Sequence, residues 1–242
     1  MRVAVVSDIH ANLAALEAVL AAIDEDPPDE LWCLGDLVGY GPRPSECTEA
    51  VAARAKICLA GNHDLAVLGK LDLLDFSGEA GMAVRWTRGV LSDAARAFLD
   101  GLEPVGAADG VSLFHASARD PVWEYVLSDD VAEATLELVS TPLVLVGHSH
   151  AALQVSLQDG LLAGGLAPAG TKLALEPGRF LLNPGSVGQP RDGDPRAAYL
   201  LLDFDARTAS FRRVDYDIAR TQAEIAAAGL PESLGLRLSA GL

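Results

Sequence analysis

The chain has 242 residues, half of them hydrophobic, a formal net charge of −16 at pH 7, and three cysteines without CxxC spacing. The acidity disfavours non-specific binding to long nucleic acid, the cysteines indicate neither a disulfide framework nor a zinc knuckle, and no stretch approaches the roughly 20 apolar residues of a membrane-spanning helix. We expect a single domain over residues 1–242 in a reducing cytoplasm, since the leading apolar run, Val3–Val6, is too short for a signal peptide.

Short apolar runs alternate with helical patterns in the first part of the chain. Their near-continuous apolar character predicts strands that are buried on both faces. Asn12 is expected to cap a helix that runs through Ala22, and Pro44 or Ser45 to open a second helix through about Arg54. The predicted strands are Val3–Ser7, Leu31–Leu34, Lys56–Ala60, Val111–Phe114 and Leu143–Val146.

Residues 65–105 are predicted to form a helical insertion. The helical pattern over Leu65–Leu102 breaks near Asp72–Ser77 and restarts after Ser92, which suits an N-cap position. The insertion contains no histidine, so we expect it to supply a wall or a dimer surface rather than chemistry. Ser128 is expected to start another helix, because acidic residues in its first turn interact favourably with the positive end of the helix dipole.

The last part of the chain changes to hairpins. Turn signals at Gln158–Gly160, Glu176–Arg179 and Asp205–Thr208 separate alternating or apolar runs. A late helix is expected over Ile218–Ala228, and Gly229 should stop it. The whole pattern therefore predicts α/β units followed by a β-rich half.

All five histidines occur in short motifs that follow the predicted strands, together with aspartate, asparagine and glycine. Open α/β sheets place their sites at the carboxyl ends of strands. A single polar residue there is more often an ordinary turn residue, but five such coincidences are less probable than one site. The sequence therefore predicts one metal centre. The motifs are Asp8-Ile9-His10, Gly35-Asp36, Gly61-Asn62-His63-Asp64, His115 and Gly147-His148-Ser149-His150.

These blocks, in this order, resemble the calcineurin-like metallophosphoesterase superfamily, whose pattern is D-x-H, G-D, G-N-H-D/E, a lone His and G-H-x-H. The resemblance extends through Asn183–Gly188, covers nearly the whole chain, and is strongest to the small bacterial phosphodiesterase branch. It implies an α/β fold: a four-layer αββα sandwich of two mixed β-sheets flanked by helices.

The resemblance also implies two divalent metal ions. Asp8, His10 and His150 would hold the first ion, Asn62, His115 and His148 the second, and Asp36 would bridge both. Two such ions can share a water and lower its pKa, so that a bridging hydroxide attacks a small phosphoester substrate in line. Mixed nitrogen and oxygen ligands suit Mn, Fe, Zn or Ni, and the sequence does not choose among them.

The remaining histidine, His63, is the catalytic group that the resemblance implies. It would reach the substrate phosphate and protonate the leaving oxygen, while Asp64 fixes its ring. Candidate substrate-binding residues are less specific. For each of the two arginines, an exposed or ion-paired side chain is as probable as a contact with the phosphate. The two other residues could shape the rim of the site through hydrogen bonds. These candidates are Arg119, Arg191, Asn183 and Ser186.

A phosphodiesterase is the preferred interpretation, because Gly35–Gly41 lacks the arginine that serine/threonine protein phosphatases carry after the bridging aspartate. A phosphomonoesterase acting on proteins or nucleotides is the alternative. A non-catalytic binding module, such as the retromer subunit of the superfamily, is disfavoured because this chain keeps every ligand position and His63. A nuclease is disfavoured by the charge. A homo-oligomer remains open.

Overall fold

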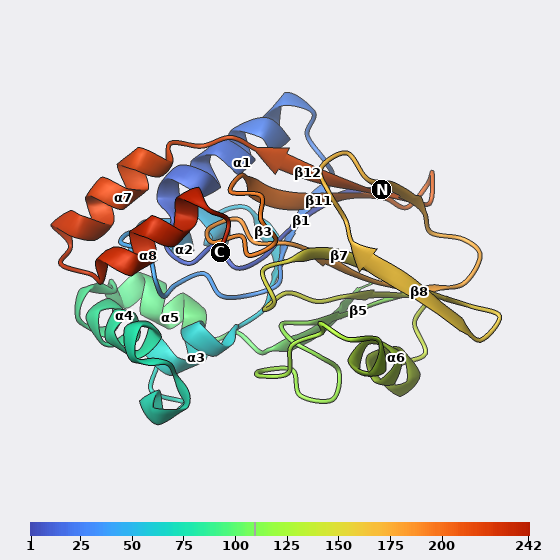
Figure 1. Cartoon of the computed structure of the whole chain (residues 1–242), viewed down its shortest axis with the longest axis horizontal. Coiled ribbons are helices and arrows are strands. Elements are labelled where there is room, and N and C mark those ends of the chain that lie inside the picture. Colours follow the sequence, from blue (N-terminus) through green and yellow to red (C-terminus); the bar gives the residue numbers. More distant parts are fainter. Residues whose placement is uncertain (109) are drawn as a thin grey trace.

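The computed structural model describes residues 1–108 and 110–242 and contains two mixed β-sheets that pack face to face (Figure 1). The first sheet has the order β3-β2-β1-β11-β12-β9, and β1, β2 and β3 run parallel. Its strands are β1 (Arg2–Val6), β2 (Glu30–Cys33), β3 (Ala55–Cys58), β9 (Lys172–Ala174), β11 (Ala197–Asp203) and β12 (Thr208–Val214).

The second sheet has the order β4-β5-β6-β10-β7-β8, and β5, β6 and β10 run parallel. The predicted turns at Gln158–Gly160 and Asp205–Thr208 join the hairpins β7–β8 and β11–β12. The predicted hairpin at Glu176–Arg179 is wrong, because this turn connects β9 of the first sheet to β10 of the second and the two strands do not pair. The five predicted buried strands match β1, β2, β3, β5 and β6 within two residues at each end. The strands are β4 (Val105–Ala108), β5 (Val111–Phe114), β6 (Leu143–Leu145), β7 (Ala152–Gln158), β8 (Leu161–Leu166) and β10 (Arg179–Pro184).

Helices cover the outer faces of both sheets, and α1 and α6 lie on opposite sides of the sandwich (Figure 1). This four-layer arrangement confirms the expected αββα sandwich. Among residues 1–108 and 110–242, no helix combines the length and the apolar character needed to cross a membrane. The helices are α1 (Leu13–Glu25), α2 (Pro44–Ala52), α3 (Asn62–Val67), η1 (Leu73–Asp75), α4 (Gly78–Val90), α5 (Asp93–Asp100), α6 (Asp129–Leu138), α7 (Ile218–Ala227), α8 (Glu232–Leu236) and η2 (Arg237–Ser239).

The continuous apolar runs have a simple cause, since each central strand faces two cores. In β1, Val3 and Val5 pack into the core between the sheets, whereas Ala4 and Val6 pack against the helices of the first sheet. Successive side chains of a strand point to opposite faces. A strand covered on both faces therefore needs apolar residues at every position.

The helix ends follow the expected caps, with one difference. The Asn12 side chain accepts a hydrogen bond from the Ala15 amide, and Ser92 caps α5 in the same way. Helix α3, however, begins inside the Gly-Asn-His-Asp motif rather than at Leu65. Asp64 accepts a hydrogen bond from the Gly61 amide, and this capping contact draws the motif into the first helical turn.

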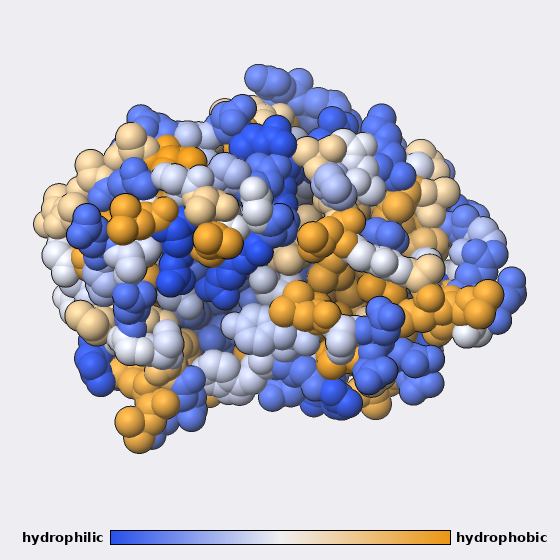
Figure 2. Space-filling model, in the orientation of Figure 1, coloured by the Kyte–Doolittle hydropathy of each residue, from blue (hydrophilic) through white to orange (hydrophobic). Residues whose placement is uncertain are grey.

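The edge strand β8 exposes apolar side chains. Leu161 and Leu166 are largely exposed, and Figure 2 shows hydrophobic surface gathered over this strand. β8 carries no charged residue, which is unusual for a sheet edge that is open to solvent. This surface lies apart from the histidine motifs.

Candidate metal centre

The seven predicted metal ligands converge at the carboxyl ends of strands from both sheets. They follow β1, β2, β3, β5 and β6, and every one of them is 4 % exposed or less. Burying this many polar side chains is unfavourable unless each finds a partner. The residues are Asp8, His10, Asp36, Asn62, His115, His148 and His150.

The ligand atoms fall into two groups that share Asp36. Asp8, His10, Asp36 and His150 offer one group, in which the ligand atoms all lie within 4.8 Å of one another. Asp36, His115 and His148 offer the second group on the same criterion. The Asn62 Oδ1 atom lies 3.3 Å from His115 Nε2, which places it with the second group. These two groups contain the residues that the resemblance assigns to separate ions, and their binding of metal stays a prediction.

The imidazole tautomers leave lone pairs facing inward. In His10, His115 and His150, the Nδ1 atom lies within 3.0 Å of a backbone carbonyl oxygen. Because a carbonyl oxygen only accepts hydrogen bonds, Nδ1 must carry the proton. Their Nε2 atoms are then unprotonated in the neutral rings. His10 Nε2 and His150 Nε2 nevertheless lie only 3.0 Å apart. Two facing lone pairs repel each other, so this arrangement calls for a cation between them.

Asp36 has an unsatisfied oxygen at the junction of the two groups. Its Oδ1 accepts a hydrogen bond from the His63 amide, whereas its Oδ2 is buried with no hydrogen-bond partner among the described residues. Oδ2 lies 3.5 Å from both His10 Nε2 and His115 Nε2. A buried carboxylate oxygen without a donor is costly, and a divalent ion on either side would satisfy it. The residues present therefore fit two metal ions.

Burial raises the pKa values of the carboxyl groups in the cluster and lowers those of the imidazoles, because it disfavours charged forms. It raises the pKa of Asp8 to about 7 and holds the pKa of Asp36 well above its usual value. It lowers the pKa of His10 and His150, and lowers the pKa of His148 to about 2. Without a counter-charge, the protein therefore favours neutral forms. Neutral imidazoles are the forms that bind metals, and a cation restores the carboxylate charge.

The backbone at the ligands is strained. Positive φ angles between 49° and 62° occur at five of the seven ligands. Non-glycine residues rarely adopt this region, and such strain is concentrated at functional sites. The five residues are Asp8, His10, Asp36, His148 and His150.

The motif glycines explain why the ligand loops can approach so closely. A Cβ atom at Gly61 would lie 2.0 Å from Asp36 Oδ1, and one at Gly147 would lie 2.1 Å from Ser7 Oγ. Any larger residue at these two positions would push a ligand loop away. The glycines of the G-N-H-D and G-H-x-H blocks are therefore steric requirements of the site.

His63 lies beside the ligand groups and lines a small pocket above them. Its ring centroid is 4.4 Å from that of Tyr40 and 5.1 Å from that of Phe76, so aromatic rings hold it on two sides. A Cβ atom at Gly39 would lie 2.3 Å from His63 Nδ1. Burial and the charge of Arg191 lower the pKa of His63 to about 3, so its ring is neutral in the free protein.

The expected hydrogen bond between Asp64 and the His63 ring is not formed. The Asp64 carboxylate accepts hydrogen bonds from the amides of Leu37, Val38 and Gly61, and His63 Nδ1 has no hydrogen-bond partner among the described residues. The physical reason is that Asp64 follows His63 directly in the first turn of α3, where its carboxylate binds the backbone amides of the neighbouring loops. Asp64 therefore holds the bridging-aspartate loop to the helix, and packing orients His63.

The two predicted arginines differ in position. Arg191 lines the pocket, donates a hydrogen bond to Gln189 Oε1 (2.8 Å), and lies over the Tyr40 ring. Arg119 is about half exposed, forms an ion pair with Glu124, and does not line the pocket. The ion-paired interpretation therefore describes Arg119, whereas Arg191 is placed to meet a bound anion.

Asn183 and Ser186 are fully buried beneath the ligand loops. Asn183 Nδ2 donates to the Gly147 carbonyl (2.7 Å), and Ser186 Oγ donates to the Asp8 carbonyl (2.7 Å). Their side chains thus fix two of the loops that carry ligands. Contact with a substrate is a separate prediction for these two residues.

The pocket above the ligands has a volume of about 160 Å³. Four aromatic residues line it, Tyr40, Phe76, Trp123 and Tyr125, and none of the four is among the site residues that the sequence predicts. Phe76 belongs to the helical insertion, which therefore supplies a wall as expected. A Trp-x-Tyr pair shortly after His115, in a chain with 5 % aromatic residues, was the available signal.

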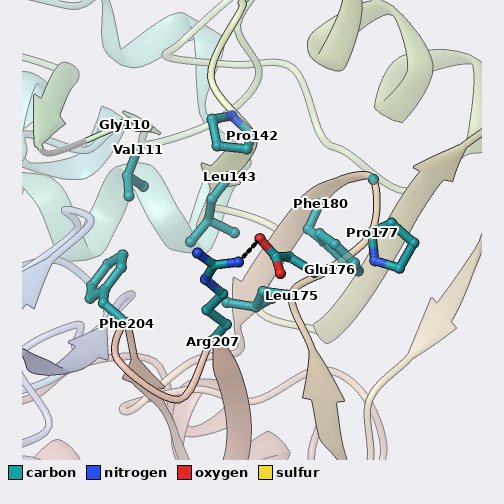
Figure 3. Close-up of a pocket in the computed structure, with 11 residues that line it drawn as sticks. Gly110, Val111, Pro142, Leu143, Leu175, Glu176, Pro177, Phe180, Phe204 and Arg207 are labelled. Atoms are coloured by element: carbon teal, nitrogen blue, oxygen red, sulfur yellow. Dashed lines mark hydrogen bonds and ion pairs between the residues drawn. The ribbon is translucent and has the colours of Figure 1, made fainter.

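A larger cavity of about 820 Å³ lies at the other end of the sandwich (Figure 3). Val111 and Leu143, the first residues of β5 and β6, line it, together with Phe180 and Phe204. Arg207 and Glu176 point toward one another across it in an ion pair. None of the predicted site residues lines this cavity, so its size does not make it the reactive site.

Comparison with known proteins agrees with this geometry. Residues 1–207 match the profile of the calcineurin-like phosphoesterase superfamily domain. An uncharacterised protein of Methanocaldococcus jannaschii is 39 % identical over 244 residues, which cover 99 % of this chain and 98 % of that protein. The crystal structure of a metallophosphoesterase from Sphaerobacter thermophilus is 42 % identical, covers 100 % of this chain and 99 % of its own, and gives a TM-score of 0.91.

A further similarity is local. The symmetrical bis(5′-nucleosyl)-tetraphosphatase of Ectopseudomonas mendocina is 38 % identical over 71 residues. These residues cover 28 % of this chain and 26 % of that protein. The match is thus confined to a part of each chain.

Proposed function

The chain belongs to the calcineurin-like phosphoesterase superfamily, and we propose that it is a dinuclear metal-dependent phosphodiesterase that hydrolyses small phosphate diesters. One observation carries the proposal. Asp36 belongs to both ligand groups, and its Oδ2 has no other partner among the described residues. A shared carboxylate between two clusters of neutral imidazoles is the donor set that a pair of divalent ions requires.

Each ion would have ligands of its own in addition to Asp36. Asp8, His10 and His150 would hold one ion, and Asn62, His115 and His148 would hold the other. When bound, two such ions offset phosphate charge and lower the pKa of a shared water. Mn, Fe, Zn and Ni all suit these ligands.

His63 and Arg191 would act on the substrate from the pocket. Both line it, and Arg191 is the one lysine or arginine among the described residues that does so. Arg191 would orient a phosphate oxygen by charge-assisted hydrogen bonding. His63 would hold the leaving oxygen and, once it has taken up a proton beside the bound phosphate anion, deliver that proton to it, an effect of about 10²–10⁴-fold.

Two features favour a diester over a monoester. Asp75 lines the pocket and adds a negative charge near its entrance. A phosphomonoester dianion carries one more negative charge than a diester, so Asp75 opposes it more strongly. The loop after Asp36 also reads Leu37-Val38-Gly39 and supplies no arginine for a second phosphate charge.

Hydrolysis of dinucleoside polyphosphates is the second candidate. The local identity to a symmetrical bis(5′-nucleosyl)-tetraphosphatase favours it. The acidic pocket entrance and the net charge of −16 oppose it, because such substrates carry several negative charges. The kcat/KM for diadenosine tetraphosphate, measured beside that for a simple diester, separates the two.

The test of the proposed function uses protein stripped of metal by a chelator and then reloaded with Mn²⁺. We expect hydrolysis of bis(p-nitrophenyl) phosphate to return with the metal and to exceed that of p-nitrophenyl phosphate by at least about tenfold in kcat/KM. A preference for the monoester would make the protein a phosphomonoesterase. Metal-loaded protein that cleaves none of these substrates would be a binding module.

A further inference from the structure

The pocket above the ligand groups is walled by aromatic side chains. The chain contains 13 aromatic residues (six Phe, three Trp and four Tyr), and four of them line this one small pocket. A hydrated phosphate gains nothing from apolar rings. The rings are therefore suited to contact the group that is attached to the phosphate. They are Tyr40, Phe76, Trp123 and Tyr125.

Tyr125 presents one open face. Its ring stacks on His148, with centroids 4.1 Å apart and planes inclined by 19°. Although His148 covers one face, Tyr125 remains 45 % exposed. A large aromatic ring fixed on one side and open to solvent on the other is a ready platform for a second ring.

The segment that carries Tyr125 is fastened to the ligand groups. His148 Nε2 donates a hydrogen bond to the Trp123 carbonyl (3.2 Å), and the Trp123 ring contacts Phe76 edge-on at 5.1 Å. Ser117 Oγ also donates to the Glu124 carboxylate. The platform is thus held at a fixed place beside the second ligand group.

The pocket is too small to enclose more than a phosphate and its nearest atoms. Its volume of about 160 Å³ is below the roughly 300–1,000 Å³ typical of sites that bury a drug-sized ligand. The rest of a substrate must therefore lie at the pocket entrance. Tyr125 is the one exposed residue among the four aromatic residues of the pocket, and Trp123 lies two residues before it.

We propose that the open face of Tyr125, with Trp123 beside it, is a subsite that stacks a flat unsaturated ring attached to the phosphate. The preferred substrates would then be aryl or nucleoside phosphoesters rather than alkyl phosphoesters. This inference rests on the proposed function for the place of the phosphate. The competing interpretation is that the rings only keep water from the pocket, in which case they would affect every ligand equally.

The test measures binding rather than turnover, because phosphonates are not hydrolysed. Titration calorimetry on Mn²⁺-loaded protein compares methylphosphonate, phenylphosphonate and the 5′-methylenephosphonate analogue of adenosine 5′-monophosphate. We expect at least one ring-bearing ligand to bind about tenfold more tightly than methylphosphonate, the order expected for one stacked ring. Tighter binding of phenylphosphonate would show that the subsite stacks an aryl ring attached directly to the phosphorus. Tighter binding of the nucleotide would show that it stacks a base separated from the phosphorus by the sugar.

Variants locate the effect. Tyr125→Ala should remove most of the tenfold preference, and Tyr125→Phe should retain it because the ring remains. Leu127→Ala is the matched control, since Leu127 is also exposed, lies two residues away and does not line the pocket. It should leave the preference unchanged. Should Tyr125→Ala lose metal, Trp123→Leu, which keeps the carbonyl that contacts His148, should still lower the preference several-fold.

Three results would overturn the subsite. Equal binding of all three ligands to the unaltered protein would leave the aromatic wall without a role in recognition, while the phosphate site would stand. A preference that survives Tyr125→Ala and Trp123→Leu alike would place the ring elsewhere. If no ligand binds at all, the proposed phosphate site fails, and the subsite fails with it.

Discussion

The two ends of the β-sandwich are built by the same strands and are chemically opposite. At the carboxyl ends of β5 and β6, His115 and His148 lie buried in a cluster of ligands around a pocket of about 160 Å³. At their amino ends, Val111 and Leu143 line a cavity of about 820 Å³ (Figure 3). The larger cavity is lined by none of the predicted metal ligands.

Unsatisfied polar atoms, and not volume, distinguish the reactive end. The ion pair of Arg207 and Glu176 at the amino end is 62 % and 56 % exposed, so water screens both charges. Asp36 Oδ2 at the carboxyl end is buried with no hydrogen-bond partner among the described residues. A buried carboxylate oxygen without a partner needs an explanation, and bound cations would supply one.

The largest effect is expected from a substitution that removes the carboxylate shared by the two ligand groups. Asp36→Asn keeps the shape of the side chain but removes the charge shared by the two groups. We expect loss of at least one metal per chain, by elemental analysis, and a fall in diester hydrolysis larger than the roughly 10–100-fold typical of residues that support ligands. The control is Arg207→Ala at the amino end, which should leave both quantities unchanged. Equal effects of the two variants would contradict the comparison.

The next variant separates chemistry from metal binding within the carboxyl end. His63→Ala should keep the metal content of the unaltered protein and lower kcat by about 10²–10⁴-fold, because the proton donor to the leaving oxygen is lost. The effect should shrink for a diester whose leaving group needs no proton. A variant that emerges without metal would show that His63 is instead a structural part of the centre.

A third variant tests whether packing alone orients His63. Gly39→Ala places a Cβ atom 2.3 Å from His63 Nδ1, and the ring must move. We expect a loss of kcat of about tenfold or more with metal content unchanged, since misplacement by about 1 Å can cost about 10²-fold.

The matched control for Gly39→Ala is Gly160→Ala. Gly160 has a similar positive φ (77° against 87°), but nothing lies within 4 Å of the new Cβ atom. Both variants therefore carry the same kind of backbone strain, and only one touches His63. If both lower kcat equally, the loss reflects strain and not the position of the ring.

The smallest expected effect concerns charge at the pocket entrance. Asp75→Asn should raise kcat/KM for p-nitrophenyl phosphate a few-fold relative to bis(p-nitrophenyl) phosphate, because the exposed carboxylate repels the dianion more. The ratio should converge at high salt, where exposed charges are screened. An unchanged ratio at low salt would remove Asp75 as a cause of diester preference.

Local patterns were sufficient to predict the five buried strands and the gathering of the histidine motifs at their ends. The run Val3–Val6 leads directly to Asp8 and His10, so one short segment specifies both a buried strand and two candidate ligands at its carboxyl end. The G-H-S-H block does the same after β6. Because the ligands lie at strand ends, their convergence results from the sheet order and needs no knowledge of side-chain packing.

The rest depended on contacts between distant segments. Asp64 was expected to orient the His63 ring, but it caps the Asp36 loop, and packing against Tyr40 and Phe76 orients that ring instead. Phe76 reaches the site only because the helical insertion folds back over it. No periodicity or spacing along the chain encodes such a contact.

The central claim is that Asp36 joins two metal-ligand groups, and anomalous scattering from crystals of the Mn²⁺-loaded protein tests it most directly. We expect two metal peaks, one among Asp8, His10 and His150 and one among Asn62, His115 and His148, with Asp36 in contact with both. A single peak, or two peaks that Asp36 does not touch, would contradict it.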